Sequence, residues 1–122
     1  MDNQCIKKKR IFVKGKVCFC TLEVAMTLIG GKWKTLIIYH LKNGPMRSSS
    51  LQHLLIGISN KMFTQTVREL ENYELVERIV YPVVPPKVEY KLTTLGQSVL
   101  PIIMDMERWG NDICDRFEQE DD

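Results

Sequence analysis

The sequence predicts a mainly α-helical domain that carries one small β-hairpin. Apolar residues recur at helical spacing between residues 22 and 73. Residues 75–92 then change to the period of two that is typical of strands, and a last amphipathic stretch runs from about residue 94 to 117. A chain of 122 residues with this pattern is expected to form a single domain.

Two helices are expected around the Gly30-Gly31 pair. In the first helix, apolar side chains recur up to Ile29, and the glycines end it because glycine readily adopts the conformation found after helices. The second helix runs from about Lys32 to Lys42. The segment 43–45 ends it, since its glycine terminates helices and its proline cannot continue one.

Two more helices are expected on either side of Gly57, which allows a tight turn. Ser48, Ser49 and Ser50 offer hydroxyl groups that can cap a short third helix. Ser59 is the expected cap of a fourth helix, which runs to about residue 73. These segments therefore predict a helix-turn-helix.

A hairpin and a long helix complete the expected domain. Residues 75–81 and 88–92 form its two strands, and a proline-rich loop joins them. The long helix is expected to start near Thr93 or Thr94 and to bend at Pro101, because proline removes a backbone donor. A helix-turn-helix followed by a hairpin is the winged helix-turn-helix arrangement, here flanked by N- and C-terminal dimerisation helices.

Charge is distributed unevenly along the chain. Residues 1–68 hold 12 Lys and Arg against 2 Asp and Glu, whereas residues 93–122 hold 2 against 8. We divide the chain into a basic N-terminal arm (1–19), a winged-helix domain (20–117) whose dimerisation helix spans about 94–117, and an acidic tail (118–122). No apolar run reaches the roughly 18 residues of a membrane span, so no membrane contact and a cytoplasmic location are expected.

The fourth helix has an outward face of the residue types that bind base edges and phosphates. Acidic residues follow only from Glu69 onward. This order predicts that the helix enters the major groove of double-stranded DNA. Arg47 before the third helix and Lys87 at the hairpin tip are expected to bind phosphate. The other predicted DNA-binding residues are Ser59, Asn60, Lys61, Thr64, Gln65 and Arg68.

The side chains along one face of the last helix are too apolar for the surface of a monomer. A homodimer on a pseudo-palindromic operator is therefore predicted, since two-fold DNA sites match two-fold proteins. The alternative is that these side chains pack on their own domain. The predicted interface residues on the last helix are Ile102, Met106, Trp109 and Ile113.

Seven stretches resemble the HxlR family of bacterial winged-helix regulators: CTLEVAMTLIGGKWK (20–34), NGPMR (43–47), GISNKM (57–62), RELE (68–71), LVER (75–78), YPVVPPKVEY (81–90) and LTTLG (92–96). The resemblance covers about residues 20–110 and implies a homodimeric, MarR-like transcriptional regulator. It implies that the first and last helices form the dimer, so Leu22 and Met26 of the first helix join the predicted interface. It also implies that the fourth helix and the hairpin bind DNA. The sequence departs from the family pattern at Thr21, where proline is usual, and at Ser48, where an aromatic residue is common.

Some members of that family respond to electrophiles or oxidants through a cysteine before the first helix, and Cys20 falls on that position. A helix N-terminus and nearby lysines both lower a thiol pKa, so Cys20 is a candidate redox sensor. Cys5, Cys18 or Cys114 could form a disulfide with it, although all four are expected to be reduced by default. The alternative is that Cys20 is a small apolar filler.

Other functions remain open at this stage. No nucleophile elbow, phosphate-binding loop or pair of catalytic carboxylates occurs, so the chain is not expected to be an enzyme. The motif at residues 18–20 offers two thiol ligands but no evident full set for zinc, so neither a metal nor a cofactor is expected. The alternatives are a winged helix that binds only proteins, and a regulator that answers to a small ligand or metal without thiol chemistry.

Overall fold

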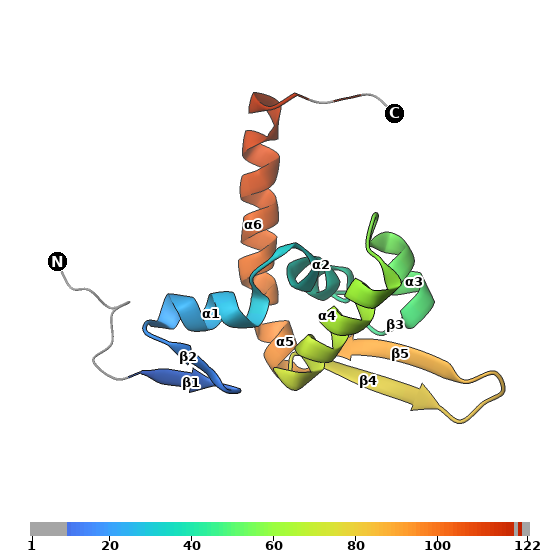
Figure 1. The fold of residues 1–122 in the computed structure, drawn as a ribbon. Coiled ribbons are helices and arrows are strands. Elements are labelled where there is room, and N and C mark those ends of the chain that lie inside the picture. The colour runs from blue at the N-terminus through green and yellow to red at the C-terminus, as the bar shows by residue number, and fades with distance from the viewer. Residues whose placement is uncertain (1–9, 119, 121–122) are drawn as a thin grey trace.

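The computed structural model describes residues 10–118 and residue 120, and it has the predicted mainly helical, winged helix-turn-helix architecture (Figure 1). The helix-turn-helix lies on one side of the base of a long hairpin, and a C-terminal helix projects away from both. The helices are α1 (Thr21–Ile29), α2 (Lys32–His40), α3 (Ser48–Leu54), α4 (Asn60–Asn72), α5 (Thr94–Ser98) and α6 (Leu100–Ile113), followed by a short 3-10 helix (Cys114–Arg116).

Two antiparallel sheets accompany the helices. Strand β1 (Ile11–Val13) pairs with β2 (Lys16–Cys18). The other sheet has the order β3 (Met46–Arg47), β5 (Lys87–Leu92), β4 (Val76–Tyr81). We call β4, β5 and the loop 82–86 between them the wing. Its strands begin within one residue of their predicted positions.

The core lies where α2, α3 and α4 meet the base of the wing. Helix α4 buries Phe63, Val67 and Leu70, which its 3.6-residue period places on one side. They pack with buried residues of α2 and α3, among them Ile37 and Leu51. Burial of this apolar stripe stabilises α4 and turns its opposite side to solvent.

The N-terminal arm contains a hairpin: β1 is the short strand expected at Ile11–Val13, but its partner β2 and the turn between them were not predicted. Its turn is made by Lys14 and Gly15, which both have positive φ (47° and 84°), as the tight turn of a two-residue hairpin requires. Three-residue strands are too short for their alternation to be recognised in the sequence. Residues 1–9 of the arm, and residues 119, 121 and 122 of the acidic tail, lie outside the described part.

The predicted long C-terminal helix is two helices, which meet at Val99. Pro101 lies in the first turn of α6, where its missing N–H has no helical partner to lose, so it begins a helix instead of bending one. Gly96 in α5 packs so closely on the backbone just before β4 that a Cβ there would lie 2.1 Å from the Leu75 carbonyl oxygen. The predicted serine cap of α3 is also wrong: its N-cap is Arg47, and no side chain caps it.

Among the described residues, none of the helices has the length and apolar character to cross a membrane.

Candidate nucleic-acid interface

The polar face of α4 is built by its cap and its buried stripe. Ser59 Oγ accepts a hydrogen bond from the backbone N–H of Met62 at 3.1 Å, which confirms the predicted cap and starts the helix. The buried stripe then orients the helix so that all six residues predicted on α4 and its cap are exposed. Five of them line one shallow depression along the helix: Asn60, Lys61, Thr64, Gln65 and Arg68.

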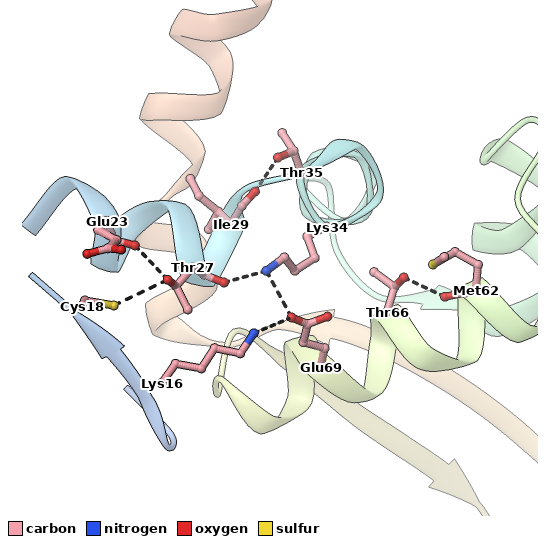
Figure 2. Close-up of polar contacts among 10 residues, drawn as sticks. All are labelled: Lys16, Cys18, Glu23, Thr27, Ile29, Lys34, Thr35, Met62, Thr66 and Glu69. Carbon is pink, nitrogen blue, oxygen red and sulfur yellow. Dashed lines mark hydrogen bonds and ion pairs between the residues drawn. The ribbon is translucent and has the colours of Figure 1, made fainter. Parts of the chain in front are cut away.

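Glu69, the carboxylate nearest to this face, is turned toward other helices. Its Oε1 lies 3.3 Å from Nζ of Lys34 on α2, and the same ammonium donates to the Thr27 carbonyl oxygen at 2.6 Å (Figure 2). Only 13% of the Lys34 side chain is exposed. An inward ion pair thus neutralises the acid closest to Arg68, and the polar face of α4 remains basic.

A second basic site lies between α3 and the wing. Strand β3 brings Arg47 beside β5, in register with Glu89. A hollow of about 470 Å³ separates α3 from the wing, and Arg47, Arg78 and Lys87 all line it. Three cations and two serine hydroxyls around one hollow suit a phosphate group. The hollow is lined by Arg47, Ser48, Ser49, Gln52, Arg78, Pro85, Pro86, Lys87, Val88 and Tyr90.

Two residues of this interface were missed by the sequence analysis. Arg78 joins the basic hollow because β4 pairs with β5 in a register that places it opposite Tyr90. Gln52 on α3 donates a hydrogen bond to the side chain of Asn60, so it couples α3 to the start of α4. For Arg78, the only sequence signal was its positive charge on a predicted strand of the wing. Nothing in the sequence indicated that Gln52 belongs to the interface.

Lys87 lies at the base of the loop in β5, so its predicted place at the hairpin tip is wrong. Its Nζ is 3.4 Å from Oε2 of Glu89, and the Tyr81 hydroxyl donates to Glu89 Oε1 at 2.9 Å. The hydrogen bond from Tyr81, together with Lys87, lowers the pKa of Glu89. The loop 82–86 has no charged residue, and Val84 in its middle is fully exposed. The wing therefore offers less free positive charge than its sequence suggests.

Comparison with known proteins agrees with this geometry. Residues 28–118 match the model of the family described as HxlR-like helix-turn-helix. The chain belongs to this family. It is thus a helix-turn-helix transcriptional regulator with a MarR-like fold, and it is not an enzyme.

Relatives resemble this HxlR-family regulator over most of its length. The uncharacterised regulator YkvN of Bacillus subtilis is 50% identical over 91 residues, which cover 75% of this chain and 77% of YkvN. The oxidised form of the redox regulator HypR superimposes with a TM-score of 0.74 at 37% identity and covers 84% of this chain and 100% of HypR. For the reduced form of YodB from B. subtilis, the TM-score is 0.68 at 36% identity, with coverage of 82% and 99%.

Apolar side chains cover one face of α1 and one of α6. In α1, Leu22 and Met26 are each 61% exposed. In α6, Ile102, Met106 and Trp109 are each more than half exposed. Ile113, at the end of the same helix, is partly buried. The residues predicted for the dimer interface therefore leave a large apolar area uncovered in a single chain of the regulator.

The cysteines of the regulator differ in state. Cys20 is the N-cap residue of α1 and is disulfide-bonded, so the expectation of a reduced thiol is wrong for this residue. Cys18 and Cys114 are free thiols. Cys18 is buried with Sγ 3.6 Å from Oγ1 of Thr27, which indicates a packing role. Cys5 lies outside the described residues, and the described part of the chain contains no cluster of three potential metal ligands.

Proposed function

We propose that this regulator binds a pseudo-palindromic DNA operator as a homodimer, with α4 in the major groove and the wing beside it. The observation that carries the proposal is the exposed face of α4, where Asn60, Lys61, Thr64, Gln65 and Arg68 line one depression. The nearest carboxylate, Glu69, is paired inward with Lys34. A helix with this distribution of charge meets phosphates without repulsion.

The side chains of this face suit two kinds of contact. Lys61 and Arg68 can bind phosphates or guanine edges, and Asn60 and Gln65 can read adenine. The hollow formed by α3 and the wing lies beside α4, where it can hold the adjacent backbone. Affinity that depends on these cations should fall steeply with salt, because each contact releases a counterion.

The apolar faces of α1 and α6 support a two-fold dimer. Large side chains such as Trp109 and Met106 stabilise an interface when they leave water, by about 25 cal/mol for each Å² of apolar surface. A two-fold dimer would place two α4 helices on successive major grooves, about 34 Å apart. Half-sites spaced by one turn of DNA are therefore expected.

Selection of duplexes from a randomised library tests the DNA proposal. Lys61→Ala and Arg68→Ala should each weaken binding of the selected duplex about tenfold or more, since each protomer then loses one charged contact. Arg108→Ala, on α6, is the matched control, because it removes an exposed cation distant from α4. Unchanged affinity of both α4 variants, with circular dichroism spectra like that of the wild type, would contradict the assignment of this face.

We also propose that Cys20 is a redox sensor, and the similarity to the redox regulator HypR favours it. Cys20 joins the N-terminal hairpin to α1, which carries part of the proposed dimer face. Two thiols, Cys20 and a second cysteine, would each lose a proton and an electron to diamide, which becomes the hydrazine as the disulfide forms. The second candidate is a regulator without thiol chemistry.

A gel shift with the selected duplex separates these two candidates. Wild-type protein reduced with dithiothreitol and then treated with diamide should change its DNA affinity, whereas Cys20→Ser should bind like the reduced protein and ignore diamide. Cys114→Ser, which removes an exposed thiol elsewhere, is the control and should respond like wild type. A full response from Cys20→Ser would favour the second candidate.

A further inference from the structure

The N-terminal hairpin of β1 and β2 is a docked part of the domain, although it precedes the residues that match the family model. Val13 packs against the hydrophobic core, and Cys18 is 1% exposed. The opposite side of the hairpin shows Phe12 and Val17, which are cross-strand partners, to solvent. Apolar contacts of its inner side therefore hold the hairpin in place.

This docking brings two lysines to the acidic end of α4. Lys16 Nζ lies 4.0 Å from Glu69 Oε1, the same carboxylate oxygen that Lys34 contacts (Figure 2). Lys14, in the turn, places its Nζ 3.9 Å from Oε2 of Glu74, just after α4 ends. Contact with the Tyr73 side chain, and then Glu69, raises the pKa of Lys16, so its ammonium is charged at neutral pH.

These two pairs are too exposed to contribute much to folding. The Lys14 and Lys16 side chains are 47% and 61% exposed, and exposed ion pairs add little to stability. Their charges act instead on the electrostatic potential around α4. Glu69 directly follows Arg68, so its carboxylate lies on the order of 10 Å from any phosphate that Arg68 binds, a distance comparable with the screening length in physiological salt.

We propose that the N-terminal hairpin is an electrostatic part of the DNA interface: Lys14 neutralises Glu74, and Lys16 adds a second positive charge beside Glu69, which Lys34 already pairs. The two lysines would thus raise the affinity of α4 for DNA without contacting the DNA. The inference rests on the proposed DNA-binding function. It assigns a positioning role to the hairpin backbone, which holds the two ammonium groups beside the acidic end of the recognition helix. Both lysines should therefore influence affinity through charge and not through shape.

Fluorescence anisotropy with a random-sequence duplex and with the selected operator tests this. Lys16→Met should weaken binding about threefold at 50 mM salt, and Lys16→Glu about tenfold. Both effects should fade above about 300 mM salt, because the screening length becomes shorter. Lys16→Arg should bind like wild type. The melting temperatures of the three variants should equal that of the wild type, because the pair is exposed.

A double variant distinguishes neutralisation from direct contact and from mechanical bracing. Lys14→Met alone should weaken binding at 50 mM salt, and Lys14→Met/Glu74→Gln should restore it, because the local net charge is then that of the wild type. If Lys14 instead contacted a phosphate, or if the Lys14–Glu74 pair held α4 in place, the double variant would bind DNA as weakly as Lys14→Met. Arg108→Gln, which removes an exposed cation on α6 that also pairs with a carboxylate, is the control and should bind normally.

The outcomes separate this inference from the proposed function. Wild-type protein that binds neither duplex overturns the proposed function itself. Wild-type protein that binds while Lys16→Glu binds equally well at 50 mM salt overturns only the inference. A double variant that stays as weak as Lys14→Met also overturns it.

Discussion

The inward pair of Lys34 and Glu69 should stabilise the domain measurably, in contrast to the exposed pairs around it. The Lys34 ammonium donates to the Thr27 carbonyl oxygen at 2.6 Å and to Glu69 at 3.3 Å (Figure 2). Hydrogen bonds to charged groups contribute about 1.5–3 kcal/mol, and Glu69 is 35% exposed, so we expect a loss at the low end for Glu69→Gln, about 1–2 kcal/mol. Lys34→Met should lose a similar amount, since the apolar stem is kept but both acceptors lose their donor.

A double-mutant cycle isolates the pair. Urea unfolding of the wild type, Lys34→Met, Glu69→Gln and the double variant should give a coupling energy of about 1 kcal/mol. The protein concentration must be equal in the four experiments, because the proposed dimerisation would stabilise the folded state by mass action. The coupling should persist in high salt, since a mostly buried pair is weakly screened. A coupling energy near zero would refute the reasoning, because Lys34 would then be satisfied by the carbonyl oxygen alone.

Three further predictions concern packing, pH and assembly. Gly96→Ala should lower stability by several kcal/mol, on the order of 3, because its Cβ would overlap the Leu75 carbonyl oxygen; a thermal melt near that of the wild type would contradict this. Burial lowers the pKa of His40 below its usual 6.5, so the unfolded chain binds the proton more readily than the folded one. The free energy of unfolding should therefore fall as the pH drops from 6.5 through the folded-state pKa of His40. In urea titrations at several pH values, His40→Gln should remove this effect. Trp109→Ala should shift sedimentation from dimer to monomer, and an unchanged sedimentation coefficient would argue against α6 as the interface.

The elements to which we assign DNA binding could be predicted because their signals are local. Ser59 was expected to cap α4, and the helix begins at the next residue. The alternation of residues 88–92 marked β5, which begins one residue earlier. Capping, helical period and strand alternation involve neighbours a few residues apart, so they can be recognised in the sequence alone. The exposed polar side of α4 could be predicted from the same helical period of apolar residues.

What the periodicity could not predict depends on contacts between distant segments. Lys34 and Glu69 are 35 positions apart, and only the packing of α2 against α4 turns the carboxylate inward. Arg78 joins the basic hollow through a strand register, and Glu89, which pairs with Lys87, accepts a hydrogen bond from the Tyr81 hydroxyl on the facing strand. These pairings set how much charge each side chain shows to DNA.

The sequence by itself therefore determined the kind of domain, its recognition helix and most of the residues on the polar face. Only the tertiary structure decided that the N-terminal arm folds into a hairpin against the end of α4, and that the C-terminal helix divides at Val99. The physical reason is that a helix or strand of sufficient length is specified by its own residues, whereas a three-residue strand or an ion pair is stable only when the rest of the fold brings its partner within reach.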